Sequence, residues 1–293
     1  MREFEHAVRA PLVLRGRTFV WGERTHVMGI INATPDSFSG DGVAQNLDAA
    51  LEKARRFAAA GCDIIDIGGE STRPGHQPVD VSEEARRVLP VISAVRRALS
   101  DMPISIDTFK PAIAARAVDL DADMINCVWG APPGILEVAA TNGAALVIMH
   151  NRENTEYEGD VVEEVIASLG RSAEDAIGAG VAAEHIIVDP GIGFGKSAEQ
   201  NLEILGRLHE FVQHLPYPLL IGTSRKSFIG KVTGLPVERR LLGTAASVAL
   251  SIAGGADIVR VHDVEEMIPV VQVADAIVRG ATTFARPQEA GTT

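Results

Sequence analysis

Eight short runs of β-branched and other apolar residues alternate along the chain with segments of helical periodicity. Each run is too short for a helix and is rich in Ile and Val, so it predicts a strand buried on both faces. The strict alternation predicts an α/β protein, a single closed parallel (β/α)8 or TIM barrel. The runs are HVMGII (26–31), DIIDIG (63–68), ISID (104–107), MIN (124–126), ALVIMH (145–150), IIVDPG (186–191), LLIGTS (219–224) and IVRVHD (258–263).

The segments between the runs carry helix signals. Apolar residues recur at helical spacing from Leu47 to Ala58 and from Leu202 to Leu215, which predicts an amphipathic helix in each stretch. Gly61, Gly143 and Gly180 follow predicted helices, where a left-handed C-cap is favoured. A doubly wound open sheet would alternate in the same way, but it usually begins with a glycine-rich dinucleotide turn. No such turn follows the first run.

The domain organisation predicted from the sequence is simple. Residues 11–22 resemble a hairpin with Gly16 near its turn, so residues 1–24 are expected to form an N-terminal extension whose hairpin caps the barrel bottom. No shift in composition marks a second domain, and residues 25–284 are assigned to the barrel. Residues 285–293 are expected to be a flexible tail.

Charge and composition exclude several classes of protein. The chain has 293 residues, with 27 Lys and Arg against 39 Asp and Glu and a net charge of −12, which does not suit a sequence-blind nucleic-acid binder. Two cysteines cannot build a disulfide framework. The first ten residues lack the apolar core of a signal peptide, and the longest charge-free apolar stretch is shorter than the roughly 20 residues of a membrane span. We expect a soluble, cytoplasmic protein.

A polar group stands at the carboxyl end of every predicted strand. In a parallel barrel these ends meet at one face, where active sites lie. The pattern therefore predicts a site for a polar small molecule. The residues are Asn32, the segment 66–73, Asp107, Asn126, His150, Asp189, the run 224–226, Arg260 and His262.

These strand-end groups fall into two chemical sets. Arg73, Lys226, Arg260 and His262 form a cationic set that suits a phosphate group. Asp107 and Asp189 are carboxylates that need donors, and a heterocycle with a ring N–H beside an exocyclic amino group supplies two. The two sets together predict a phosphorylated substrate with a guanine-like ring.

Several of these residues have structural interpretations that the sequence leaves open. Asp66 is as well suited to capping a helix or pairing with Arg73 as to binding a ligand. His150 is better explained as a satisfied interior histidine, and Arg225 as a structural cation. GIGFGKS (191–197) lacks the spacing of a phosphate loop, so its glycines are assigned to backbone geometry. Phe194 among them is expected to line the site.

Six motifs resemble, in order, those of the dihydropteroate synthase family of pterin-binding enzymes. The first two are MGIINATPDSFS (28–39) and DIGGESTRPG (66–75). SIDTFKP (105–111), DPGIGFGK (189–196), SRKSFIG (224–230) and RVHD (260–263) follow. The resemblance extends from the first predicted strand to the last helix.

The resemblance implies an eight-fold αβ barrel that condenses 6-hydroxymethyl-7,8-dihydropterin diphosphate with 4-aminobenzoate, in folate synthesis, with Mg²⁺ as cofactor. It also implies that Asp36, Arg73, Lys226, Arg260 and His262 act in catalysis. By motif, the pterin contacts are Asp107, Asn126, Asp189 and Lys226, and the Mg²⁺ ligand is Asn32. The anion pocket is formed by Thr72, Arg73, Arg260 and His262, and the 4-aminobenzoate side by Pro74, Phe194 and Ser224. Asp36 lies on the loop that closes over the site.

Two positions depart from the family pattern. FSGDG (38–42) stands where the family usually has FSDGG, and Cys127 follows Asn126 where the family usually has Asp. A missing carboxylate beside the pocket predicts weaker pterin binding or less support for Lys226. A pterin-binding paralogue with weak or no synthase activity, a pterin-dependent methyltransferase domain and a Schiff-base aldolase using Lys226 remain alternatives.

The family resemblance also implies a homodimer built from the late helices. Leu241, Ala245, Val248 and Ile252 give one of these helices an apolar stripe. The same stripe is what packing against the barrel requires, so the sequence does not choose between the two.

Overall fold

The computed structural model describes residues 9–33, 43–70 and 79–280. Eight strands form one sheet with every described pair parallel, in the order β8-β7-β6-β5-β4-β3-β10-β9. A bridge between Val188 and Leu219 joins the two outer strands and closes the barrel. The strands are β3 (His26–Asn32), β4 (Ile64–Gly68), β5 (Ile104–Asp107), β6 (Met124–Cys127), β7 (Ala145–Met149), β8 (Ile186–Asp189), β9 (Leu220–Ile221) and β10 (Ile258–Val261). The predicted fold class is confirmed.

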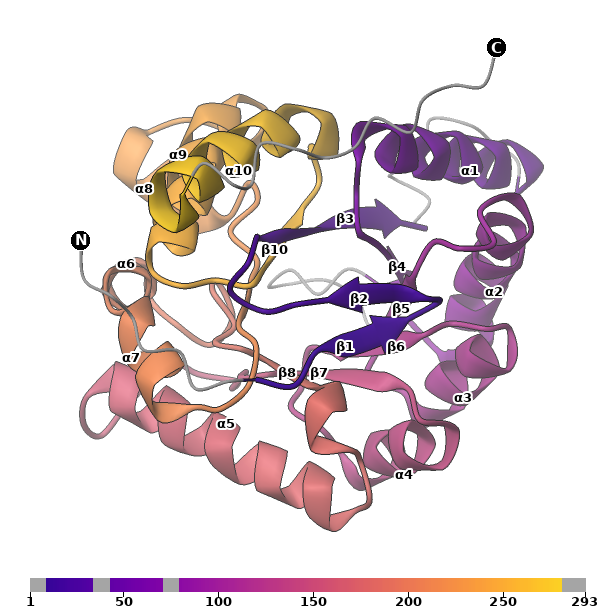
Figure 1. Cartoon of the computed structure of the whole chain (residues 1–293), viewed down its shortest axis with the longest axis horizontal. Helices are drawn as coiled ribbons and strands as arrows, with labels where there is room; N and C mark the ends of the chain where they lie inside the picture. The colour runs from indigo at the N-terminus through magenta and orange to yellow at the C-terminus, as the bar shows by residue number, and fades with distance from the viewer. Residues whose placement is uncertain (1–8, 34–42, 71–78, 281–293) are drawn as a thin grey trace.

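Helices surround the barrel (Figure 1). Most of the core lies between them and the strands, with a second apolar cluster inside the barrel. The helices are α1 (Val43–Ala60), α2 (Val81–Ala98), α3 (Pro111–Asp119), α4 (Pro133–Asn142), α5 (Val161–Gly178), α6 (Ala198–Gly206), α7 (Leu208–His214), α8 (Ser227–Thr233), α9 (Leu241–Ala253) and α10 (Val264–Arg279), with 3₁₀ turns at Ala183–His185 and Val237–Arg239. Within the three described ranges, no helix is long and apolar enough to cross a membrane.

The predicted helix from Leu202 to Leu215 is two helices in the structure. The chain leaves helical geometry at Arg207, which has φ −120° and ψ 22° and separates α6 from α7. The guanidinium of Arg207 bonds Asp160, Glu203 and Glu210 at 2.6–2.9 Å. Both short helices pack against the same core, so the apolar pattern of the sequence continues across Arg207. For this reason the pattern does not reveal the break between the two helices.

The predicted hairpin is confirmed at the barrel bottom. β1 (Leu12–Leu14) pairs antiparallel with β2 (Arg17–Phe19) through a turn at Arg15 and Gly16, which both have positive φ. Leu12, Leu14 and Phe19 are buried in the cluster inside the barrel, together with residues at the amino ends of the strands. Figure 1 shows the hairpin lying across this end of the barrel. The hairpin therefore seals the face opposite the strand carboxyl ends.

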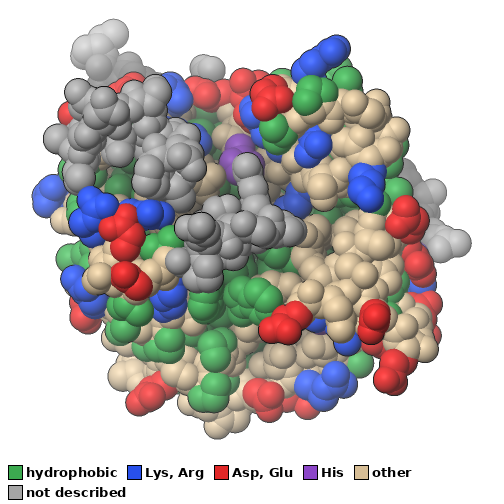
Figure 2. Space-filling view, turned by 180° about the vertical axis from the view of Figure 1, so that it is seen from behind, with side chains coloured by type: hydrophobic (Ala, Val, Ile, Leu, Met, Phe, Trp, Pro, Cys, Tyr) green, Lys and Arg blue, Asp and Glu red, His purple; other side chains and the backbone are tan. Residues whose placement is uncertain are grey.

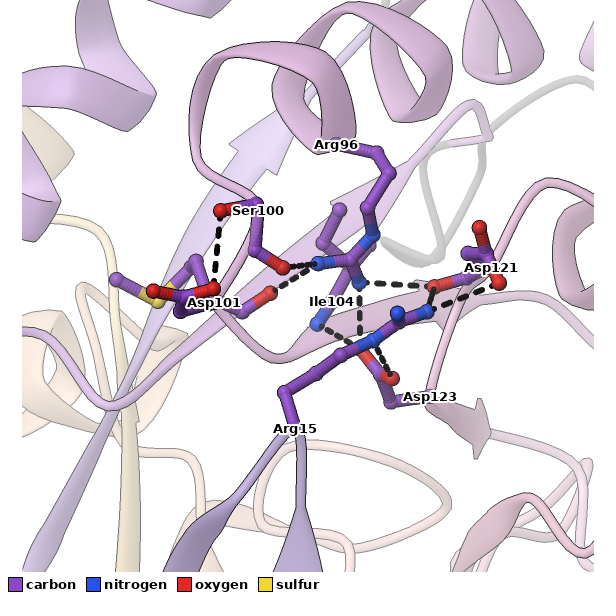
Figure 3. Close-up of polar contacts among 8 residues, drawn as sticks. Arg15, Arg96, Ser100, Asp101, Ile104, Asp121 and Asp123 are labelled. Carbon is purple, nitrogen blue, oxygen red and sulfur yellow. Dashed lines mark hydrogen bonds and ion pairs between the residues drawn. The ribbon is translucent and has the colours of Figure 1, made fainter.

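An ion-pair cluster joins the hairpin turn to the barrel (Figure 3). The Asp123 carboxylate accepts from Arg15 Nε and from Arg96, each at 2.6 Å, and from the backbone N–H of Ile104 at 2.9 Å. Its side chain is only 10 % exposed, whereas the neighbouring Asp121 carboxylate, which is 67 % exposed, meets Arg15 at 3.1 Å. Asp123 is the group that links three segments here.

We expect Asp123→Asn to lower the free energy of unfolding by about 2–3 kcal/mol. The neutral amide loses the ion pairs with Arg15 and Arg96 and brings an N–H group where the carboxylate accepted hydrogen bonds. Urea denaturation measures the loss. Asp121→Asn is the matched control and should cost under about 1 kcal/mol, since that ion pair is exposed. Equal losses in the two variants would contradict the assignment of Asp123 as the link.

Candidate active site

The polar residues predicted from the strand ends lie at the face opposite the hairpin. Asn32, Asp107 and Asp189 end β3, β5 and β8, and Asn126 and Arg260 lie within β6 and β10. Figure 2 looks onto the molecule from the side away from the hairpin, where basic and acidic side chains are interspersed. Successive side chains of a strand point to opposite faces of the sheet, so every second residue of each strand points toward the barrel axis.

Arg260 is the centre of this group. Its guanidinium donates to Asp66 at 2.6 Å and to Asp107 at 2.5 Å. Asn126 donates from Nδ2 to the same Asp66 oxygen at 3.2 Å. Burial opposes charge on Arg260, but Asp66 and Asp107 raise its pKa above the usual range. The guanidinium is therefore charged and shared between two carboxylates.

Two carboxylates facing one guanidinium leave acceptor capacity unused. Asp66 is fully buried, and its Oδ1 and the Oδ1 of Asp107 have no hydrogen-bond partner among the described residues. Burial raises the pKa of the Asp107 carboxyl, against the pull of Arg260, and the charge of Asp66 adds to the shift. A ligand that brings N–H donors would satisfy these oxygens.

Asp189 and Lys226 form the other side of the site. Asp189 accepts from the backbone N–H of Gly191 at 2.7 Å, and burial raises the pKa of its carboxyl. Burial also lowers the pKa of the Lys226 ammonium to about 7, with Arg260 adding to the effect and Asp189 and Asp107 opposing it. The charge on Lys226 therefore depends on Asp189, Asp107 and Arg260 together.

The loop after β8 lies directly against Lys226. Lys226 Nζ donates to the carbonyl of Ile192 and lies 3.9 Å from the centre of the Phe194 ring. Gly193 has φ 83°, and a Cβ there would come within 2.7 Å of the Lys226 side chain, so only glycine fits. The predicted lining residue Phe194 is thus brought to Lys226 by a cation–π contact.

Ser224 and His262 are paired beside this group. Ser224 Oγ accepts from the backbone N–H of His262 at 3.1 Å and lies 2.9 Å from His262 Nδ1. The neighbouring Arg225 turns away and binds Asp263 with two hydrogen bonds, at 2.8 and 2.5 Å. The interpretation of Arg225 as a structural cation is confirmed, and Lys226 is not crowded by it.

Four predicted site residues, Asp36, Thr72, Arg73 and Pro74, lie outside the described residues, as does the FSGDG segment. The described part of the second motif, residues 66–70, is held by hydrogen bonds at Gly69 and Glu70. Arg87 donates to the carbonyl of Gly69 at 2.8 Å, and Glu70 receives Lys110 and the N–H of Val79.

Asp66 and His150 have partners that the sequence did not identify. Asp66 accepts from Arg260 and Asn126, and its predicted pairing with Arg73 lies outside the described residues. His150 Nδ1 lies 3.0 Å from Lys196 Nζ, and burial lowers the pKa of the imidazole to about 3. His150 is therefore a neutral, structural acceptor, as expected.

Cys127 does not border the site as expected from the sequence. Side chains alternate along β6, so Asn126 faces the axis while Cys127 is fully buried in the core between strands and helices. Burial raises the pKa of its thiol to about 12. A carboxylate at this position would face the same core, on the side of β6 opposite to Asn126.

Two residues of the site were missed from the sequence. Lys196 is 8 % exposed and binds the carbonyls of the glycine-rich loop. Asn201 accepts from the N–H of Gly193 at 2.6 Å and donates to the carbonyl of Ser197. A lysine inside a glycine-rich strand-end loop was the available signal for the first. Asn201 lies on α6, and its sequence position carries no such signal.

Comparison with known proteins gives consistent results. The model of a family described as pterin binding enzyme matches residues 28–262. A dihydropteroate synthase from Synechocystis is 47 % identical over 279 residues, covering 92 % of this chain and 96 % of that protein. A structure of the Clostridium difficile dihydropteroate synthase in the presence of pteroic acid is 49 % identical, with a TM-score of 0.86, covering 88 % of this chain and 98 % of that one. A Xanthomonas albilineans dihydropteroate synthase with 4-aminobenzoic acid has a TM-score of 0.86 at 40 % identity, covering 91 % and 97 %.

The lowered lysine pKa values give a direct test of the site's electrostatics. The chain has five lysines, so NMR of ¹³C-labelled lysine side chains can follow each one. We expect the resonances of Lys196 and Lys226 to titrate near pH 7, losing charge as pH rises. Lys196→Met and Lys226→Arg each assign one resonance. Resonances of Lys196 and Lys226 that both titrate above about pH 9 would contradict the burial argument.

Proposed function

This chain belongs to the pterin-binding enzyme family, among the dihydropteroate synthases, and from that premise we propose which of its residues carry the reaction. The reaction condenses 6-hydroxymethyl-7,8-dihydropterin diphosphate with 4-aminobenzoate and releases 7,8-dihydropteroate and diphosphate, a transferase step of folate synthesis. The observation that most supports the residue roles is the set of buried carboxylate oxygens around Arg260 that have no hydrogen-bond partner within residues 9–33, 43–70 and 79–280.

The acidic side of the site is suited to the pterin ring. Asp107 and Asp189 present carboxylates to ring and exocyclic N–H groups, and charged acceptors make the stronger hydrogen bonds. Asn126 adds an amide that Asp66 already orients. Lys226 offers an N–H donor to the ring carbonyl or nitrogen. In this role Arg260 balances the carboxylates and favours the ionised form of Asp107 when the ring binds.

The diphosphate side is assigned to Arg260 and His262, with Arg73 from outside the described residues. Asn32 ends β3 with a partly exposed side chain beside Gly68, so its amide oxygen suits a Mg²⁺ ion that takes its other ligands from phosphates and water. Among the described residues, no group of three or more His, Cys, Asp or Glu is arranged to hold a metal. Bound Mg²⁺ would supply positive charge for the leaving diphosphate.

The chemistry breaks a carbon–oxygen bond to diphosphate and forms a carbon–nitrogen bond to the arylamine. The reacting methylene is conjugated to an electron-rich dihydropterin, which favours departure of diphosphate ahead of attack. Arg260 and His262 stabilise the charge that grows on the leaving group. The amine is a free nucleophile at neutral pH, and its proton leaves without a strong base once the bond has formed. We assign 4-aminobenzoate to Phe194, whose ring faces Lys226, and to Ser224, which contacts His262.

The partner and location are also proposals. Val248 and Ile252 of the predicted stripe on α9 are buried, and Leu241 and Ala245 pack against the same core. The exposed apolar residues of α9 and α10 lie on other faces, and Leu242, Leu250, Val273 and Ile277 are 60–82 % exposed. These four residues support a homodimer through the late helices.

The two cysteines bear on the proposed location of the protein. Both are free and buried, which is compatible with the reducing cytoplasm.

Diphosphate release in the presence of both substrates tests the proposed function. We expect turnover that requires 4-aminobenzoate and Mg²⁺. Asp189→Asn should weaken dihydropterin binding by calorimetry at least tenfold, about 1.4 kcal/mol, because an amide N–H then meets ring donors. Ser105→Ala is the control, since its buried hydroxyl has no partner among the described residues. Binding of dihydropterin without turnover would favour the non-catalytic paralogue, and loss of a methyl group from a folate would favour the methyltransferase.

The raised pKa of Asp107 predicts how pterin affinity depends on pH. Ring donors need the ionised carboxylate, so affinity should fall as pH is lowered from about 8 to 5.5 and Asp107 takes up a proton. An aspartate with an ordinary pKa would stay ionised across this range. Asp107→Asn should bind more weakly and lose most of the pH dependence, which separates the carboxyl from titration of the ligand itself. A flat profile for the unaltered protein would contradict the assignment.

A further inference from the structure

A buried ammonium outside the proposed set of substrate contacts ties two strand ends together. Lys196 Nζ lies 2.9 Å from the carbonyl oxygen of Phe194, 3.2 Å from that of Gly191 and 3.5 Å from that of His150. It also lies 3.0 Å from His150 Nδ1. Three ammonium protons therefore meet four acceptors, all within the segments that follow β7 and β8.

The loop that Lys196 binds has little freedom to move elsewhere. Gly191 has φ 71° and Gly195 has φ 55°, and a Cβ on either would come within 2.5 Å of backbone oxygens of His150 or Arg152. Tyr157 donates to the carbonyl of Gly195 at 3.0 Å. The loop is thus pressed against the segment after β7 on one side and against Lys226 on the other.

We propose that Lys196 is a positioning residue for the synthase reaction. Its ammonium holds the loop carbonyls of Gly191 and Phe194 to His150, and this contact fixes the Phe194 ring over Lys226, where 4-aminobenzoate binds. The inference deepens the proposed function and rests on the assignment of Phe194 to the arylamine side. Lys196 itself touches no substrate.

Several buried acceptors face residue 196, so the side chain at this position must donate more than one hydrogen bond. An apolar side chain would leave the carbonyls of Gly191 and Phe194 without this donor in a buried setting. His150 accepts at Nδ1 because burial and the charges of Lys196 and Arg152 keep its imidazole neutral. The other charged groups acting on the ammonium are Asp189, which favours its charge, and Lys226 and Arg152, which oppose it.

A double-mutant cycle between Lys196 and Phe194 tests the proposal. Steady-state kinetics would be measured for the full chain, Lys196→Met, Phe194→Ala and the double variant, with dihydropterin affinity measured by calorimetry. We expect Lys196→Met to raise KM for 4-aminobenzoate about tenfold while dihydropterin affinity changes less than about twofold. In the Phe194→Ala background the same substitution should change KM less than about twofold, because the ring it positions is gone.

Controls separate positioning from general damage. Lys231→Met removes an exposed lysine and should leave both constants unchanged. If Lys196→Met does not fold, Lys196→Gln, which keeps two N–H donors, takes its place in the cycle and should raise KM by a smaller factor. Equal increases in both Phe194 backgrounds, or no increase, would overturn the proposal. An inactive unaltered protein would instead refute the proposed function, and Phe194→Ala with unchanged KM would refute both the role of Phe194 and this inference.

Discussion

The site depends on one guanidinium held between two buried carboxylates. Arg260 reaches Asp66 and Asp107, which are 194 and 153 residues away in the chain and come from β4 and β5. Burying two negative charges with one positive charge costs free energy, because one charge is left without an opposite partner away from water. Within the described part of the chain, one oxygen of each carboxylate has no hydrogen-bond partner, and we propose that an amino-heterocycle supplies the missing donors. Under the proposed assignment, the donors of the pterin ring would offset this imbalance of charge.

The barrel makes this arrangement possible by register. β10 pairs with β3, β3 with β4 and β4 with β5, so their inward-facing residues stand at neighbouring heights around the axis. The hairpin and its Asp123 cluster seal the amino ends of the strands, and they keep the apolar interior below the polar layer. The polar layer faces the strand carboxyl ends, where the loops carry Phe194, Ser224 and His262.

Much of this could be predicted from the sequence, because strand runs and strand-end polar residues are local patterns. All eight predicted strands and the hairpin are confirmed. What could not be predicted depends on contacts across the barrel or on side-chain direction. The pairing of Asp66 with Arg260 links strands far apart in the sequence. The carbonyl groups that Lys196 binds leave no trace in the sequence, and only its place in a glycine-rich loop pointed to it. Cys127 was placed at the pocket because neighbours in sequence were treated as neighbours in space, whereas β6 turns them to opposite faces.

The most direct test of the account is a crystal structure with dihydropterin diphosphate bound. The account predicts that ring and exocyclic nitrogens donate to Asp107 and Asp189, that Arg260 stays bound to Asp66, and that the diphosphate lies toward Asn32 and His262. A ring bound elsewhere on the barrel face, or one whose nitrogens leave both carboxylates without a donor, would contradict it.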